Sequence, residues 1–462
     1  MQTQPKHDEM FENIEYASGE KAGDIEETIS IIQERERRNT LSRVISRKLD
    51  THLMPLLCVL FVLSYLDRGN IGNAKTAGAQ SDLGLNSVQW SWVLLSFYIT
   101  YTCFEFLVLC WKIFPAHIYV PSLCVGGAVH SLGGLVATRV LIGFFEAGFG
   151  AGVPYFMSMA YKRSELGVRL AILLGTSPIA NCVAEGIPTI LIAPVVYFCL
   201  MDNVATAKFL TEDERAFAVE RLQTIDTTAK SKLSKVQIWA GISDYKSYCH
   251  ALIHFCCNYS FACLSNFLPT IVQGLGYTSI RAQGLTAPPY LGAFICCVFA
   301  AFTSTKFGQR GPMTAGFATL GAIGYGLLAS QTDTHVRYAG IWFASCGVFP
   351  ALALNMTWML NNQAGDTKKG IVMSMLAIFG QCSSFVASTI FPVEDKPYYV
   401  KGTAVGCGLT GLIVPISLFL HFKLKAENER RNALSATVNA QEGHQIDVTA
   451  LGDAHQGFRY FT

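Results

Sequence analysis

Long apolar runs alternate with short polar connections along most of this chain. Nine runs have the low charge density and the length, about 20 residues, that a membrane-crossing helix needs. We expect these helices at residues 51–66, 90–111, 133–160, 247–271, 285–303, 312–330, 336–358, 370–391 and 402–421. Within lipid only helices and closed barrels satisfy their own backbone groups. The pattern therefore predicts an all-α integral membrane protein.

Two further regions are apolar but too short for ordinary spans. Residues 112–132 offer only the run 118–129, and residues 167–201 are interrupted by a Gly-Ile-Pro sequence. About 35 residues cannot form two full crossings and a turn at a rise of about 1.5 Å per residue. Within a nominal total of twelve crossings, we therefore expect spans three, five and six to be truncated.

A polar stretch at residues 202–246 divides the spans into two sets. Within it, Thr211 and Glu214 have the spacing of a capping box, so we expect a short amphipathic helix there, lying on the membrane surface. The sequence thus predicts two six-helix bundles in a chain of five parts. These are an N-terminal tail (1–50), a first bundle (51–201), the central loop (202–246), a second bundle (247–421) and a C-terminal tail (422–462).

Basic residues collect in alternate connections between the spans. One cluster precedes the first span, another follows the fourth span, and others lie in the central loop, in later connections and after the last span. They include Arg35, Arg37, Arg38, Arg43, Arg47, Lys48, Lys162, Arg163, Arg169, Lys208, Arg215, Lys306, Arg310, Lys368, Lys369, Lys423 and Arg430. Positive connections stay on the cytoplasmic side. We therefore expect a multi-pass protein, in the plasma membrane, with both termini in the cytoplasm.

Composition agrees with a lipid environment. Hydrophobic residues make up 51% of the chain and charged residues 15%, against about 25% charged residues in soluble domains. The 15 cysteines lie mostly within apolar runs and lack the paired spacing of a metal site, so we expect them to be packing residues. The net charge of +2 is dispersed in short bursts, which predicts no nucleic-acid partner.

Ionisable side chains interrupt three of the apolar runs, where an unpaired charge costs several kcal/mol. Asp67 and Arg68 end the first span, and Glu105 lies in the second. Arg139 and Glu146 are two helical turns apart and share one face of the nominal fourth span, residues 133–160. We expect Glu146, Glu105 and Asp67 to take part in proton coupling and Arg139 to attract an anionic substrate. The alternatives are an interfacial ion pair for Asp67 and a structural hydrogen bond for Glu105.

The tenth span is rich in amides. We expect Asn355 and Trp358 to contact substrate, with hydrogen bonding between helices as the alternative for the amide. Other residues have predicted roles in gating or helix packing, the glycines because they let a neighbouring helix approach closely. These residues are Arg68, Asn70, Gly143, Gly148, Arg163, Glu165, Arg169 and Arg310. For the basic residues among them, the alternative is that they only orient the spans.

Motifs of catalysis and nucleotide binding are missing from the sequence. It contains no GxSxG nucleophile turn, no HExxH zinc motif and no Walker A glycine loop. We therefore expect neither an enzyme nor an ATP-driven transporter, and we expect no metal and no cofactor.

Several segments resemble the major facilitator superfamily and, within it, the fungal anion:cation symporters, which include allantoate, nicotinate, pantothenate and biotin permeases. The segments are YLDRGNIGNAK, RVLIGFFEAGFGAGVPYFMSMAYKRSELGVR, FLPTIVQGLGYTSIRAQGLTAPPY, NNQAGDTKKG and LGDAHQGFRY. The resemblance implies two bundles around a central cavity that alternates between inward-open and outward-open states. It also implies co-transport of a proton with an organic anion. The positions that match family motifs are Asp67, Arg68, Asn70, Arg139, Gly143, Glu146 and Gly148.

The chain departs from these relatives in three places. Thr305 stands where the gating loop of the superfamily usually has an aspartate, and the chain is shorter between 111 and 133 and between 183 and 186. Our leading hypothesis is a monomeric proton symporter for a small organic anion, either a carboxylate vitamin such as nicotinate or pantothenate or an allantoate-like ureide. The alternative is a transport-inactive paralogue, a nutrient sensor or an inactive truncated isoform.

Overall fold

The computed structural model describes residues 22–76, 78–109, 132–182, 201, 203–207, 209–223, 234–277, 279–391, 395, 398–438, 453 and 458–462. This described part consists of helices and short connections, without a strand. Nine of its helical segments are long and apolar enough to cross a membrane. They coincide with the nine expected spans, which confirms the all-α membrane fold.

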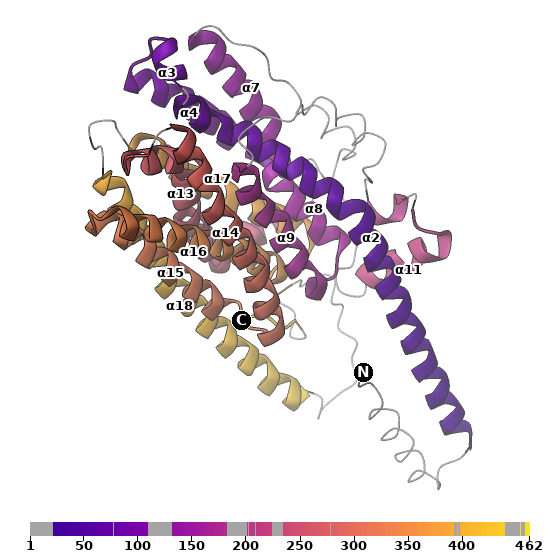
Figure 1. The fold of residues 1–462 in the computed structure, drawn as a ribbon. Helices are drawn as coiled ribbons and strands as arrows, with labels where there is room; N and C mark the ends of the chain where they lie inside the picture. Colours follow the sequence, from indigo (N-terminus) through magenta and orange to yellow (C-terminus); the bar gives the residue numbers. More distant parts are fainter. Residues whose placement is uncertain are drawn as a thin grey trace, which may run out of the picture.

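The helices form two halves joined by a polar segment (Figure 1). The first half contains α2 (Ala22–Thr76), α3 (Ala79–Asp82), α4 (Ser87–Phe104), η1 (Glu105–Leu109), α7 (Leu132–Gly150), α8 (Gly152–Ala160) and α9 (Arg163–Cys182). The joining segment contains η3 (Val204–Thr206), α11 (Glu212–Gln223) and α12 (Lys235–Ile242). The second half contains α13 (Tyr245–Gly274), α14 (Ser279–Phe307), α15 (Gly311–Ser330), α16 (Thr334–Asn361), α17 (Asp366–Thr389) and α18 (Val400–Val438).

The twelve-crossing count is confirmed only in part. The expected short span at 112–132 and most of the second half of region 167–201 lie outside the described residues. Helix α9 occupies residues 163–182, the beginning of that second region. The expected division at residues 50, 201, 246 and 421 stays a prediction, although α2 continues without a break from the polar N-terminal region into the first span.

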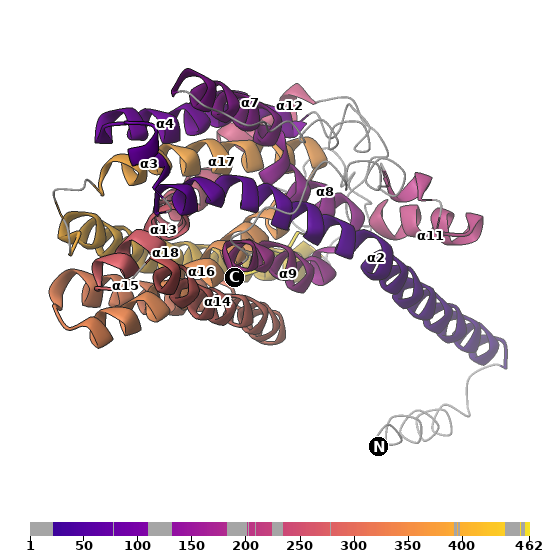
Figure 2. The same ribbon diagram turned by 45° about the horizontal axis from the view of Figure 1, so that its top comes forward.

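The predicted amphipathic helix of the central segment is α11, and it begins with the expected capping box. The Thr211 N–H donates to Glu214 Oε2 at 2.9 Å, and the Glu214 N–H donates to Thr211 Oγ1 at 3.4 Å. Lys48 of α2 also donates to Glu214 at 2.7 Å. This contact, followed by the backbone bond of Thr211, lowers the pKa of Glu214. Helix α11 is therefore anchored to the polar part of α2 (Figure 2).

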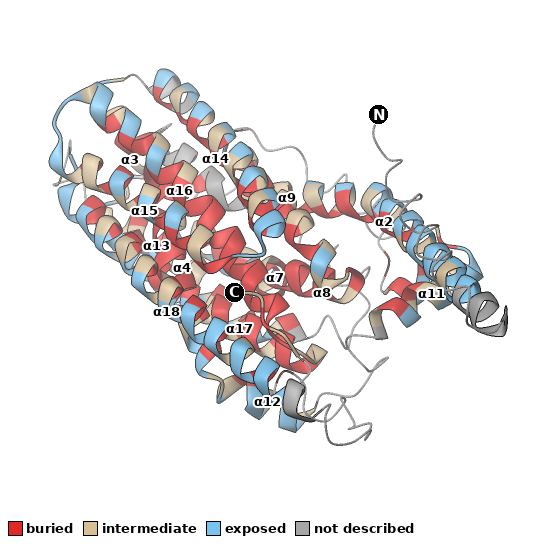
Figure 3. Ribbon diagram, turned by 90° about the horizontal axis from the view of Figure 1, so that it is seen from below, coloured by how far each residue is buried: buried red, intermediate tan, exposed pale blue. Residues whose placement is uncertain are grey.

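The centre of the molecule is formed by α13 and α16, whose side chains are mostly buried, whereas the polar end of α2 is exposed (Figure 3). Glycines allow the closest helix contacts. A Cβ atom at Gly324 of α15 would lie 2.2 Å from the backbone nitrogen of Ala344 of α16. A Cβ at Gly143 of α7 would lie 2.7 Å from the carbonyl oxygen of Phe97 of α4. Gly143 therefore lies where α7 and α4 approach each other closely, and its packing role stays a prediction.

Candidate functional site

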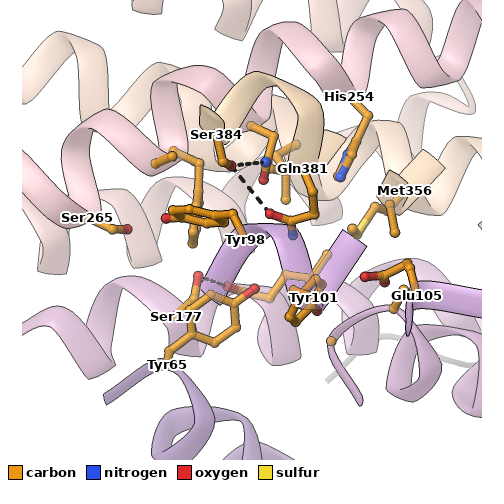
Figure 4. A pocket seen from close by; sticks show the side chains of 18 of the residues that line it. Tyr65, Tyr98, Tyr101, Glu105, Ser177, His254, Ser265, Met356, Gln381 and Ser384 are labelled. Atoms are coloured by element: carbon orange, nitrogen blue, oxygen red, sulfur yellow. Dashed lines mark hydrogen bonds between the residues drawn. The ribbon is translucent and has the colours of Figure 1, made fainter. Parts of the chain in front are cut away.

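A small cavity, partly open to the outside, lies between the two halves. It is bounded by α2, α4, η1, the end of α7 and α9 from the first half and by α13, α16 and α17 from the second (Figure 4). Its polar and aromatic lining residues are Tyr65, Tyr98, Tyr101, Glu105, Ser177, His254, Asn258, Phe261, Ser265, Asn266, Gln381 and Ser384. Because both halves contribute walls, the cavity depends on how the halves meet.

Hydrogen bonds hold the polar wall of the second half in place. Asn258 Nδ2 donates to the carbonyl oxygen of Gly380 at 2.8 Å and to Ser384 Oγ at 2.9 Å. Ser384 Oγ is in turn 3.4 Å from the acceptor Gln381 Oε1. Both amide hydrogens of Asn258 are therefore used within the protein, and this residue joins α13 to α17 rather than offering donors to a ligand.

His254 lies one turn before Asn258 on the same face of α13 and lines the cavity. Its side chain is 4% exposed, and its ring packs so closely on α17 that a Cβ at Gly380 would lie 2.5 Å from His254 Cδ2. Within the described part of the chain, its Nδ1 atom has no hydrogen-bond partner. A buried imidazole costs free energy while it lacks a partner, so this ring is suited to bind a polar ligand.

Glu105 faces the cavity from the first half, where α4 changes into the 3-10 turn η1. Its side chain is fully buried and points toward the cavity (Figure 4). Among the described lining residues there is no lysine or arginine. Glu105 and His254 are therefore the ionisable lining groups apart from the tyrosines, and they belong to opposite halves.

Aromatic rings cover much of the remaining wall. Tyr65 of α2 and Phe261 of α13 meet edge to face, with ring centroids 5.5 Å apart. Asn266 Nδ2 of α13 donates to the hydroxyl of Tyr98 of α4 at 2.8 Å. Both contacts connect the two halves across the cavity. Such a wall offers ring faces and edges to a planar ligand.

Four other predicted substrate and proton residues are described, and none of them lines the cavity. Arg139 and Glu146 are buried on α7 but do not line the cavity. Asn355 Oδ1 lies 2.8 Å from His250 Nδ1, and Asn355 Nδ2 donates to the carbonyl oxygen of His250 at 3.1 Å. Trp358 Nε1 donates to the carbonyl oxygen of Phe461 at 2.8 Å. The side chains of residues 67, 68 and 70 (Asp67, Arg68 and Asn70) lie outside the described residues.

Four of the residues predicted for gating or packing collect at the end of the molecule where α8 turns into α9. They are Arg163, Glu165, Arg169 and Arg310. Arg169 donates two hydrogen bonds of 2.6 Å to the carboxylate of Asp50 of α2. Glu165 accepts from Ser46 Oγ of α2 at 3.0 Å. Arg163 instead reaches the second half and donates to the carbonyl oxygen of Asn361. Arg310 lies near the start of α9, because a Cβ at Gly167 would be 3.1 Å from its Nη2.

Sequence reasoning identified Glu105 as a candidate but missed His254. The signal was available, since His254 interrupts the apolar run at residues 247–271 in the same way that Glu105 interrupts 90–111. An ionisable residue within a span is a functional candidate by default. The hydrogen-bonding residues Asn258, Gln381 and Ser384 carried no comparable signal, because short polar residues are frequent in membrane helices.

Long apolar helices in two halves around a polar central cavity define a membrane transporter of the multi-pass helical class. The sequence profile described as Major Facilitator Superfamily matches residues 57–388, and the chain belongs to this superfamily. Its curated relatives are fungal transporters. They include the MFS-type transporter efuF of Hormonema carpetanum, 29% identical with 84% of this chain and 86% of that protein covered. The High-affinity nicotinic acid transporter of Saccharomyces cerevisiae is 26% identical, with 91% and 85% covered.

A solved structure confirms the fold at low sequence identity. The proton:xylose symporter XylE superposes with a TM-score of 0.61 at 13% identity, covering 80% of this chain and 96% of that one. The described helices therefore have the fold of this superfamily.

Proposed function

We propose that this transporter takes up a small organic anion together with a proton by alternating access through the central cavity. The observation that carries the proposal is the placement of two buried ionisable groups, Glu105 and His254, on opposite halves of one cavity. Groups of this kind in a membrane protein are kept for ion or proton pathways. The similarity to a nicotinic acid transporter supports the anionic substrate class.

The charges of these groups suggest how proton and substrate would be coupled. An ionised Glu105 would repel a carboxylate in the same cavity, and protonation of Glu105 removes that repulsion. The imidazole of His254 would donate a hydrogen bond from its ring N–H to the carboxylate. Proton binding therefore favours anion binding, and by linkage the bound anion favours the proton to the same degree.

The aromatic wall favours one group of substrates over another. Tyr65, Tyr98, Tyr101 and Phe261 present ring surfaces that suit a flat heteroaromatic carboxylate such as nicotinate. A branched carboxylate or a ureide would use the amide and hydroxyl groups more and the rings less. We therefore place ring-bearing carboxylates first, with pantothenate and allantoate-like ureides next.

The remaining predicted residues keep proposed roles away from the cavity wall. Arg139 and Glu146 share a face of α7 and are proposed to attract the anion and to pass protons, together with Asp67. A substrate contact for Asn355 or Trp358 requires that their bonds to His250 and Phe461 open during transport. The test of proton coupling therefore includes Glu105 from the cavity wall and Glu146 from α7.

The predicted topology is kept as part of the proposal. The basic residues before the first span, after α8 and in α11 meet at one end of the molecule, where Arg221 donates to Ser42 and Ser46 of α2. By the positive-inside rule this end is cytoplasmic. We propose a monomer in the plasma membrane with both termini in the cytoplasm.

The proposed function is tested by uptake of radiolabelled nicotinate into a host without its own transporter, at acidic and at neutral pH. Glu105→Gln, Glu146→Gln and the double variant should abolish the stimulation by acid, and Glu429→Gln, at an exposed position on α18, should not. Retained acid stimulation in the double variant would refute these coupling residues.

A sensor function is the second candidate, because the chain is short at 112–132 and 167–201, where spans are expected. Binding of nicotinate to the purified protein without any uptake would favour a sensor or an inactive isoform. Uptake above the level of the empty host would exclude both.

A further inference from the structure

The last residues of the chain fold back into the end of the molecule where α9 begins. Asp453 and residues 458–462 are described, and the side chain of Asp453 is buried. Asp453 pairs with Lys246 of α13 and Lys368 of α17, each at 2.7 Å. Asp244 pairs with the same two lysines, at 3.2 and 2.9 Å. The cluster contains two positive and two negative groups, so Asp453 completes its neutralisation.

Side chains of the second half also bind the backbone of this segment. Trp358 Nε1 and Asn362 Nδ2 both donate to the carbonyl oxygen of Phe461 at 2.8 Å. The Phe461 N–H donates to Asn362 Oδ1 at 2.8 Å. Asn428 of α18 forms the same pair of bonds with Tyr460, at 2.9 and 2.8 Å. The side-chain amide of Asn362 thus satisfies both backbone groups of Phe461, and that of Asn428 satisfies both backbone groups of Tyr460. These bonds fix the segment in a single bound conformation.

Arginines from both halves meet on the aromatic rings of this segment. Arg163 of α9 lies over the rings of Phe458 and Phe461, at 4.2 and 5.2 Å from their centroids. Arg310 of the second half lies 5.1 Å from the centroid of Phe461. Burial, and then the repulsion of Arg163, lower the pKa of Arg310 to about 9. The Phe461 ring thus stabilises two cations that repel each other across the boundary between the halves.

We propose that Asp453 and residues 458–462, here called the clasp, hold the two halves together at this end and must detach before the cavity opens there. The inference rests on the proposed alternating access. Detachment removes the Phe461 ring from between Arg163 and Arg310, which then repel each other directly. This repulsion favours separation of the halves at this end, so the docked clasp biases the transporter toward the state that is closed here.

Hydrogen exchange of the full-length protein in lipid nanodiscs tests the clasp without requiring transport. Two variants disrupt it independently: Phe461→Ala removes the shared ring, and Asp453→Asn removes the charge between the lysines. Phe422→Ala and Glu429→Gln, at exposed positions on α18, are the matched controls. The readout is the ratio of exchange rates at the start of α9 to those near Tyr98 and Asn266, which join the halves at a separate contact.

Both clasp variants should raise this ratio by about tenfold, because each loses a buried contact of the clasp. Both control variants should leave the ratio unchanged. An unchanged ratio in both clasp variants would overturn the proposal. So would a parallel rise at both places, because general unfolding, rather than opening at one end, would then explain the exchange. Since no substrate is added, failure of the proposed transport function would appear only in uptake and not in this ratio.

Discussion

Arg163 of α9 and Asn361 of α16 exchange hydrogen bonds across the two halves. The Arg163 guanidinium donates to the carbonyl oxygen of Asn361, and Asn361 Nδ2 donates to the carbonyl oxygen of Arg163 at 3.0 Å. Asn361→Ala removes the second bond, which contributes about 1 kcal/mol. We expect exchange at the start of α9 to rise about fivefold, with Gln331→Ala on an exposed turn as the control. Unchanged exchange would mean that this pair does not hold the halves together.

His254 should determine substrate affinity rather than folding. We expect His254→Ala to raise the KM for nicotinate about tenfold through loss of one buried hydrogen bond. His254→Gln, which keeps a donor, should recover part of the affinity. The control is His335→Gln, at an exposed position at the start of α16. If His254→Ala reduces the amount of folded protein but leaves KM unchanged, the imidazole is structural.

Substitution of Glu105 should leave exchange of substrate across the membrane intact and abolish accumulation of substrate. A glutamine resembles the protonated carboxyl group but cannot release a proton, so Glu105→Gln should still bind the anion. We expect this variant to exchange labelled for unlabelled nicotinate across the membrane and to lose accumulation against a gradient. The measurement is counterflow compared with net uptake in the same vesicles. Accumulation at the wild-type level would exclude Glu105 from coupling.

Gly143 should tolerate no side chain. Its Cβ would lie 2.7 Å from the Phe97 carbonyl oxygen, so Gly143→Ala forces α7 away from α4 and should cost about 1–3 kcal/mol. On the same helix, Gly133 has no atom within 4 Å of an added Cβ, and Gly133→Ala should be neutral or slightly stabilising. Thermal unfolding in detergent compares the two variants. Equal midpoints would show that α4 can move aside.

The clasp should not respond to mild acid. Burial raises the pKa of Asp453, but the attraction of Lys246 and Lys368 outweighs it, so the net pKa is lowered. A lowered folded-state pKa stabilises the fold above the ordinary aspartate pKa of about 3.9, and this contribution is lost as pH falls through the folded-state value.

The difference in unfolding midpoint between wild type and Asp453→Asn should therefore be constant from neutral pH to mildly acidic pH. It should shrink only in stronger acid. A difference that already shrinks in mildly acidic conditions would show that Asp453 is not held ionised by the two lysines.

Hydropathy predicted the spans well because the membrane imposes one requirement on each of them, a long apolar helix. The capping box at Thr211 was also readable, since it depends on residues three positions apart. The cavity could not be predicted from the sequence, because it depends on which faces of helices distant in sequence meet. Glu105 and Arg139 look alike as buried charges in sequence, yet Glu105 lines the described cavity and Arg139 does not.

The clasp was visible in sequence only as a segment shared with a family. Its partners in α13, α16 and α17 are more than 80 residues away, as in the pair formed by Asp453 and Lys368. Trp358 was predicted to contact substrate, but in the structure its indole N–H donates to backbone of the same chain. A side chain that can bind a ligand can equally bind a peptide, and sequence does not distinguish the two.

The cavity walls come from both halves, and neither half carries a complete binding surface. A molecule in the cavity therefore contacts the complete set of lining residues only when the two halves come together around it. Selectivity in such a protein depends on the relative position of the two halves. A substitution far from the cavity that tilts one half by a small angle would change which molecules bind, although the substituted residue contacts none of these molecules.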